Sequence, residues 1–398
     1  MSGAGGRPYL AIPGPSVMPD RVLRAMNRAS PNIYVGELVD MMPKLVADLC
    51  GVARTKGHAA IYIGNGHAAW EAGLANTVQP GEKVLVLATG RFGHGWAEVA
   101  EARGIEVQML DFGRQAPVDP QTVEDALRAD KAHDIKAVLV THVDTSSSVL
   151  NDVAAVRAAM DAAGHPALLA ADCIASLACD RFEMDAWGVD VMVAGSQKGL
   201  MTPPGLGFVF FNEKASDVRR TVPRVSRYWD WGPRTEPELF YQYFGGTAPT
   251  HHLYGLREAL DMLGEEGIEA VWARHDRLAR AVWAACEAWS AEGPLRLNIP
   301  DAAHRSRAVT SLAIGKPLGE ELRQWVEAHM GVTLGIGLGM QTEEDPRSTG
   351  YFRIGHMGHL NGHALLGVLG AVEAGLTALN IAHGDGAVQK AAQVLAAA

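Results

Sequence analysis

Two charged residues that follow successive apolar runs are the strongest chemical signal in the sequence. Asp172 comes directly after the run 167–171, and Lys198 follows the run 189–194, in the turn 195–199. If these runs are strands, both side chains lie at the carboxyl edge of an α/β sheet, where such folds bind ligands. A lysine there is partly desolvated, which lowers its pKa and makes its amine a candidate Schiff-base nucleophile. An aspartate at the neighbouring strand end could neutralise a cationic ring nitrogen, so the pair predicts more than two isolated surface charges.

A glycine-rich turn lies between an apolar run at 59–63 and a helical stretch at 67–77. It reads Gly64-Asn65-Gly66-His67-Ala68-Ala69 and matches the dinucleotide fingerprint G-x-G-x-x-A. That fingerprint also needs an acid after the next strand, and the run 83–88 leads into Thr89-Gly90-Arg91 without one. We therefore disfavour a nicotinamide site. The free N–H groups of a helix that starts at Gly66 suit a phosphate, and His67 is either part of that site or a helix cap.

Two other segments could face the same sheet edge. Phe92 follows a predicted strand end with glycine close on both sides, so its ring could lie over a ligand, although aromatic rings more often pack in a core. The run 141–148 follows another apolar strand and supplies several hydroxyls, including that of Ser146. Taken alone, this run reads only as a polar loop.

The elements that position these residues alternate between short apolar runs and amphipathic stretches, which is typical of α/β units on a mainly parallel sheet. We expect a large domain with a mainly parallel seven-stranded sheet sandwiched by helices, and a smaller C-terminal α+β domain with strands at 308–314 and 351–354 and a helix from Leu318. The predicted organisation is an N-terminal arm at 1–20, a large domain at 21–265 and a small domain at 266–398. The region 223–249, rich in aromatic residues, glycine and proline, is expected to be a loop that covers a site. The predicted strands of the large domain are 59–63, 83–88, 106–110, 137–141, 167–171, 189–194 and 207–211, and its helices are 67–77, 96–102, 119–129 and 152–163.

Composition excludes several classes of function. The 398 residues carry a net charge of −10 with no basic cluster, so neither nucleic acid nor an anionic membrane surface is an expected partner. The four cysteines show no C-x-x-C spacing, which argues against a disulfide scaffold and a structural metal site. The opening residues lack the pattern of an export signal, and no run of about 18 apolar residues occurs. We expect a cytoplasmic protein.

At these residues the sequence resembles the class V, fold-type I pyridoxal-phosphate aminotransferases, in the branch that uses alanine, serine or aspartate with glyoxylate. The resemblance rests on Pro13-Gly14-Pro15, on the segment GSQKGLMTPPG at 195–205 and on Phe352-Arg353-Ile354-Gly355, and it covers nearly the whole chain.

The resemblance implies a role for each matching residue. Lys198 would form the Schiff base with pyridoxal 5′-phosphate, and Asp172 would pair with the pyridinium nitrogen. Arg353 would clamp the substrate carboxylate, and Thr247 would reach the cofactor phosphate of the neighbouring subunit, which implies a homodimer with a shared active site. The other implied cofactor contacts are ring stacking by Phe92, phosphate binding by Gly66, His67 and Gln197, and a hydroxyl near the cofactor's O3′ from Ser146.

The sequence also departs from the family's pattern. A His-Arg-Ser-Pro block near the substrate entrance is replaced around Ser30–Tyr34, and Phe244 stands where relatives carry a phosphate-binding tyrosine. Ser148 occupies a position that is usually glycine, and 342–347 resembles an insertion. These departures bear on the choice of substrate more than on the chemistry.

The implied reaction moves an amino group from a small amino acid (serine, alanine or aspartate) to a 2-oxo acid, in the first place glyoxylate. The run Arg353–Gly358 also resembles relatives that transaminate pyridoxamine with pyruvate, so that substrate stays open. A lyase or cysteine desulfurase on the same fold is disfavoured, because Cys173, Cys179 and Cys286 lack a mobile-loop context. A cofactor-free aldolase would leave Asp172 and Arg353 unexplained, and a cofactor-binding protein without turnover would not need them.

Overall fold

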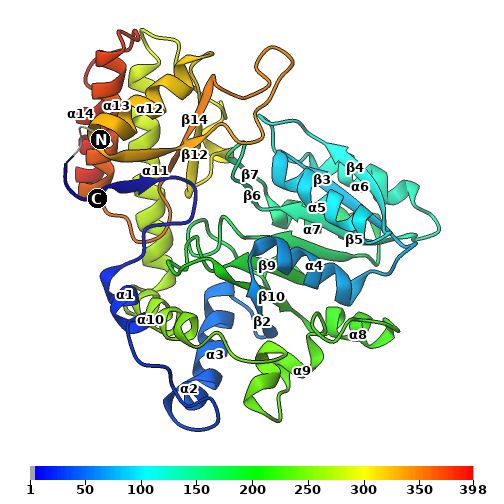
Figure 1. The fold of residues 1–398 in the computed structure, drawn as a ribbon. Coiled ribbons are helices and arrows are strands. Elements are labelled where there is room, and N and C mark those ends of the chain that lie inside the picture. Colours follow the sequence, from blue (N-terminus) through cyan, green and yellow to red (C-terminus); the bar gives the residue numbers. More distant parts are fainter. Residues whose placement is uncertain (1–4, 398) are drawn as a thin grey trace.

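The computed structural model describes residues 5–397, which build two main β-sheets covered by helices (Figure 1). The larger sheet has seven strands in the order β2-β10-β9-β8-β5-β3-β4. Strands β9, β8, β5, β3 and β4 pair in parallel, whereas β10 runs antiparallel to both β9 and β2. The predicted mainly parallel seven-stranded sheet is therefore confirmed. Its strands are β2 (His58–Gly64), β3 (Lys83–Ala88), β4 (Glu106–Asp111), β5 (Ile135–Thr141), β8 (Leu168–Asp172), β9 (Val191–Gly195) and β10 (Gly205–Phe211).

Helices cover both faces of this sheet, because its strands are apolar on both sides. Along β3, Val84 and Val86 pack with Trp70 and Trp96 of α4 (Gly66–Thr77) and α5 (Arg91–Ala102). The alternate residue Leu85 belongs to the core under α3 (Met42–Ala53), α6 (Pro120–Ala129) and α7 (Val153–Ala163). Successive side chains of a strand point to opposite faces, so a continuous apolar run requires this double cover.

The second sheet has five strands in the order β1-β13-β14-β12-β11 and is built mainly from the C-terminal part of the chain. Its first strand, β1 (Tyr9–Ala11), comes from the N-terminal segment and pairs in parallel with β13 (Val332–Ile336). Figure 1 accordingly shows the dark blue N-terminal segment that contains β1 beside the C-terminal helices. The sheet is completed by β14 (Tyr351–Gly355), β12 (Val309–Ala313) and β11 (Arg296–Leu297), and its helices are α12 (Leu318–Met330), α13 (Gly362–Ala378) and α14 (Ala387–Ala396).

Two long helices connect the sheets. α10 (Thr250–Glu266) ends at Gly267, whose φ of +84° favours glycine, and α11 (Ile268–Trp289) starts immediately after it. No helix within residues 5–397 has the length and apolar character needed to cross a membrane. The remaining elements are α1 (Asp20–Met26), α2 (Glu37–Asp40), α8 (Glu213–Thr221), α9 (Gly232–Thr235), the hairpin β6 (Val143–Asp144) and β7 (Val149–Leu150), and 3₁₀ turns at Phe240–Phe244 and Ala302–His304.

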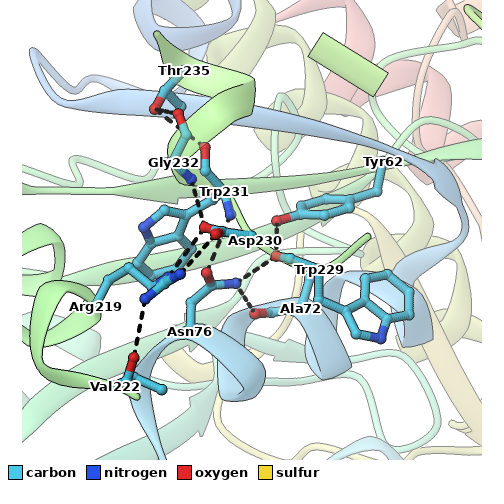
Figure 2. Close-up of polar contacts among 10 residues, drawn as sticks. All are labelled: Tyr62, Ala72, Asn76, Arg219, Val222, Trp229, Asp230, Trp231, Gly232 and Thr235. Carbon is cyan, nitrogen blue, oxygen red and sulfur yellow. Dashed lines mark hydrogen bonds and ion pairs between the residues drawn. The ribbon is translucent and has the colours of Figure 1, made fainter. Parts of the chain in front are cut away.

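The aromatic region 223–249 is anchored to the large sheet at its start by hydrogen bonds (Figure 2). The carbonyl oxygen of Trp229 accepts from the Tyr62 hydroxyl at 2.8 Å and from the Asn76 amide at 2.7 Å. Asn76 Oδ1 in turn accepts the backbone N–H of Trp231 at 3.2 Å. β2 and α4 therefore fix the base of this region.

Candidate active site

Lys198 lies in the turn after β9, and the N-terminal segment packs directly against it. Its Nζ donates to the carbonyl oxygen of Pro13, and its own carbonyl accepts from the Ser16 hydroxyl at 2.7 Å. Burial first, and the positive charge of Arg353 second, lower the pKa of Lys198 to about 8, against the opposing effect of Asp172. More of the amine is therefore unprotonated near neutral pH than in an ordinary lysine, as a nucleophile requires.

Asp172 is the last residue of β8, and its side chain is only 3% exposed. One carboxylate oxygen accepts the backbone N–H of Ile174 at 2.8 Å. Burial raises the pKa of Asp172 to about 7, because the ionised carboxylate is poorly solvated there. A cationic ring nitrogen held beside this carboxylate would favour its ionised form.

A cavity of about 180 Å³ brings these two residues together with others predicted from the sequence. The predicted residues that line it are Gly66, His67, Phe92, Asp172, Gln197 and Lys198. Side chains that the sequence did not single out complete the wall, and they are Asn65, Trp70, Val143, Thr145, Ile174 and Ala175. The indole of Trp70 contacts both His67 and Phe92 edge-on, with ring centroids at 4.6 and 6.2 Å, which was not detectable from local sequence.

One end of the cavity is the start of α4. Asn65 caps this helix, since its Oδ1 accepts from the backbone N–H groups of His67 at 3.1 Å and Ala68 at 3.4 Å. A Cβ atom at Gly66 would lie 2.3 Å from Cδ1 of Ile174, so any other residue would require the Ile174 side chain to move. Across residues 5–397, the buried Oε1 of Gln197 has no hydrogen-bond partner. Phosphate oxygens only accept hydrogen bonds, so the positive end of the α4 helix dipole and the NH₂ group of the Gln197 amide, which can donate, are the features that fit a bound phosphate group.

Phe92 is held at the cavity wall by a remote carboxylate. Asp144, on β6, accepts the backbone N–H groups of Phe92 at 2.8 Å and Gly93 at 3.3 Å. Gly90, the residue before α5, has no side chain for this task, so Asp144 caps the helix from another part of the chain. The helix consequently starts at Arg91, whereas the sequence predicted a start at Trp96.

The predicted contact by Ser146 differs from the arrangement observed. The Ser146 hydroxyl donates to Asp144 Oδ1 at 2.5 Å and accepts the backbone N–H of Arg91 at 2.9 Å. Its neighbour Thr145 lines the cavity, and Ser146 does not. The hydroxyl of Ser146 is therefore committed to holding this loop against α5.

Arg353 and Thr247 lie outside the cavity wall. Arg353, on β14, is 5% exposed and donates to the carbonyl oxygens of Ile336 and Thr145, each at 2.7 Å. Burial lowers the pKa of Arg353 to about 10. Thr247 is exposed and follows the 3₁₀ turn that contains the buried Phe244, so within one chain it does not reach the site.

The contribution of the N-terminal segment was not predicted, although its Pro13-Gly14-Pro15 motif was a signal. Gly14 has a φ of +92°, and a Cβ atom there would lie 2.6 Å from the Lys198 Nζ. Glycine is thus required where this segment crosses the lysine. Ser16 contributes a second contact through its backbone N–H, which donates to the Gln197 carbonyl at 2.9 Å.

The cysteines and potential metal ligands offer no competing site. Cys50, Cys173, Cys179 and Cys286 are buried and unpaired, and burial raises the thiol pKa of each, to about 12 for Cys179. Buried, protonated thiols are unsuited to nucleophilic attack, because the thiolate is the nucleophile. In the described part of the chain, no three His, Cys, Asp or Glu side chains gather to hold a metal ion.

The sequence profile of the Aminotransferase class-V family matches residues 9–340. The chain belongs to the class-V aminotransferases. These are pyridoxal-phosphate-dependent transaminases, so the expected enzyme class, cofactor and fold-type I architecture are confirmed.

Similar proteins cover almost the whole of this aminotransferase. A serine–glyoxylate aminotransferase of Methylorubrum extorquens is 37% identical over 93% of this chain and 91% of its own. The crystal structure of ureidoglycine–glyoxylate aminotransferase from Bacillus subtilis superposes with a TM-score of 0.87 at 29% identity, covering 98% of both chains. The crystal structure of pyridoxamine–pyruvate aminotransferase from Mesorhizobium loti superposes with a TM-score of 0.86 at 26% identity, covering 100% of both chains.

If Lys198 binds the cofactor, as the family resemblance implies, its lowered pKa predicts how pyridoxal phosphate attaches to this aminotransferase. The unprotonated amine is the reactive form, so the attachment rate of pyridoxal phosphate to the cofactor-free protein should rise with pH through a midpoint near 8. Arg353→Met should move the midpoint upward, since the charge of Arg353 lowers the pKa of Lys198. Stopped-flow absorbance from about pH 6 to about pH 11.5, a range that includes the pKa of a free lysine, measures both. A midpoint near that of a free lysine, about 10.4, would contradict the burial of this amine.

Proposed function

We propose that this aminotransferase moves the amino group of a small amino acid (serine, alanine or aspartate) to a 2-oxo acid, with glyoxylate as the favoured acceptor. The observation that carries the proposal is the convergence of Lys198, Asp172 and the start of α4 on one cavity. The similarity to a serine–glyoxylate aminotransferase over most of both chains supports the choice of substrates.

Each residue has a distinct part in the proposed reaction. Bound pyridoxal phosphate supplies an electron sink for the charge that develops on the substrate's Cα. Lys198 holds the cofactor between turnovers and, once displaced by the substrate, uses its Nζ to take the Cα proton as a general base. Asp172 holds the proton on the ring nitrogen, and the guanidinium of Arg353 binds the substrate's α-carboxylate.

The positions and ion pairs of the arginines that could bind a second carboxylate favour a monocarboxylic donor. Aspartate would need a second cation for its side-chain carboxylate. None of the candidates Arg91, Arg224, Arg227 and Arg347 lines the cavity of the described chain; Arg91 is bound to Glu98 at 2.8 Å, and the exposed Arg347 lies 3.7 Å from Glu320. We therefore place serine and alanine ahead of aspartate as donors.

The donor is tested by comparing kcat/KM for serine, alanine and aspartate with glyoxylate as acceptor. We expect serine or alanine to exceed aspartate by about tenfold or more, because one unmatched charge costs more than 1.4 kcal/mol. Pyridoxamine with pyruvate is the second candidate pair, since a pyridoxamine–pyruvate aminotransferase matches this fold over its full length. Turnover of that pair alone would overturn the amino-acid proposal.

We further propose that the enzyme is a cytoplasmic homodimer with shared active sites. Thr247 is exposed and lies outside the cavity of its own chain, which supports a contact with the partner's cofactor phosphate. Four buried free thiols support a reducing compartment. Phe244 is buried, so the tyrosine hydroxyl that relatives place there is not replaced, and Thr247 would carry more of this contact.

A further inference from the structure

Ser148 has a backbone conformation that its residue type disfavours. Its φ is +65°, in the left-handed region where a Cβ atom crowds the backbone, and it is only 3% exposed. Glycine would take this conformation without strain. A buried serine in its place needs a contact that its hydroxyl alone provides.

The hydroxyl makes such a contact with the C-terminal sheet. Ser148 Oγ accepts the backbone N–H of Ser311, on β12, at 3.1 Å. The carbonyl oxygen of Ser148 also accepts the N–H of Ser306 at 3.1 Å, and its own N–H closes a turn on the Asp144 carbonyl at 2.7 Å. Ser148 thus joins the loop that follows β5 to the segment of the chain that carries β12.

The contact lies next to the proposed carboxylate clamp. Ser311 is the direct cross-strand partner of Arg353 in the β12–β14 pair. Arg353 itself donates to the carbonyl of Thr145, three residues before Ser148 in the same loop. Between these positions, the carbonyl of Ser147 accepts from the Asn298 amide at 2.8 Å. The loop therefore contacts both strands of the pair that positions Arg353, and also Asn298, which follows β11.

We propose that Ser148 is a positioning residue, whose hydroxyl fixes β12 and hence Arg353 relative to the cavity that contains Lys198. The inference rests on the proposed role of Arg353 in binding the substrate carboxylate. Ser311 is fully buried, so loss of the hydroxyl leaves its N–H without a partner and loosens the strand at that point.

Two variants separate the effect of losing the hydroxyl from the effect of the backbone strain. Ser148→Gly removes the hydroxyl and relieves the strain, whereas Ser148→Ala removes the hydroxyl and keeps the strain. Hydrogen exchange of the β12 amides reports on the contact directly. Calorimetric binding of glycolate, an unreactive small monocarboxylate, to the cofactor-loaded enzyme reports on Arg353 without requiring turnover, and Arg353→Met should abolish that binding.

We expect both variants to exchange the Ser311 amide faster and to bind glycolate more weakly by about three- to tenfold, the effect of one buried hydrogen bond. The visible absorption band of the lysine-bound cofactor should stay unchanged, and Ser148→Gly should melt at a higher temperature than Ser148→Ala. The inference is overturned if Ser148→Gly binds glycolate and exchanges like the unaltered enzyme, or if only Ser148→Ala is impaired. An unaltered enzyme that binds glycolate but transaminates no donor would refute the proposed function, while the difference between the variants would still decide the role of Ser148.

Discussion

Replacing Lys198 by alanine is expected to lower kcat for transamination by about 10³- to 10⁴-fold, because one amine is proposed both to hold the cofactor and to move the Cα proton. The side chain lies in the cavity with its pKa lowered to about 8, so the unaltered enzyme has this amine available near neutral pH. Steady-state rates with glyoxylate as acceptor measure the loss. Mass spectrometry after borohydride reduction should find the cofactor on the peptide that contains Lys198, and no such adduct in the variant.

The same variant tests the shared active site when it is mixed with a second one. Thr247→Ala should weaken phosphate binding at the partner's site while leaving the lysine of its own chain intact. If sites are shared, a hybrid dimer of Lys198→Ala and Thr247→Ala chains has both defects in one site and an intact second site. Refolding the two chains together should therefore restore activity. A mixture no more active than its separate components would contradict the proposed dimer, and a Lys198→Ala enzyme with near-normal kcat would refute the lysine assignment itself.

Asp172→Asn is expected to lower kcat by about 10²- to 10³-fold, the range for removing a group that stabilises developing charge in a buried site. The asparagine is close in shape but carries no charge to hold a proton on the ring nitrogen. Asp172→Glu is the matched control, since it restores the charge and should recover part of the rate. An Asp172→Asn variant whose kcat lies within about threefold of that of the unaltered enzyme would show that Asp172 does not pair with the ring nitrogen.

In the cofactor-free protein the same carboxyl should make stability depend on pH. Burial raises the pKa of Asp172 to about 7 in the folded state, against about 3.9 in the unfolded chain. The folded state therefore binds the proton more tightly, so this contribution to stability is fully present below about pH 4 and is lost as pH rises towards 7. Thermal melts of the cofactor-free protein and of its Asp172→Asn variant should differ by this slope, because the other buried groups that titrate in this range, such as His142 and Asp180, are common to both.

The sequence was sufficient to predict the elements whose signal is local. The strands of the large sheet are near-continuous apolar runs except for the edge strand β4, and each predicted boundary lies within about two residues of the observed one. Asp172 ends β8 and Lys198 lies in the turn after β9, so parallel pairing of these two strands was enough to bring them together. The start of α4 was predicted for the same reason, because Asn65 caps the helix from the adjacent position.

Contacts between distant segments account for what was missed. The early start of α5 depends on Asp144, which is remote in sequence from the N–H groups it accepts. The sequence predicted that Ser146 would supply a hydroxyl at the cavity. In the structure Thr145 lines the cavity, while the Ser146 hydroxyl is bound to Asp144. Ser148 looked like a departure from a glycine pattern, and its hydroxyl acquires a partner only when β12 packs against it.

The central claim is that Lys198, Asp172 and Arg353 act on one small amino acid and one 2-oxo acid in two separable half-reactions. A single-turnover absorption experiment tests it most directly, with L-serine or L-alanine added to the cofactor-loaded enzyme in the absence of an acceptor. The account predicts that the visible band disappears with one of these donors and returns when glyoxylate is added. A band that no amino acid bleaches, or one that persists unchanged in Lys198→Ala, would contradict the account.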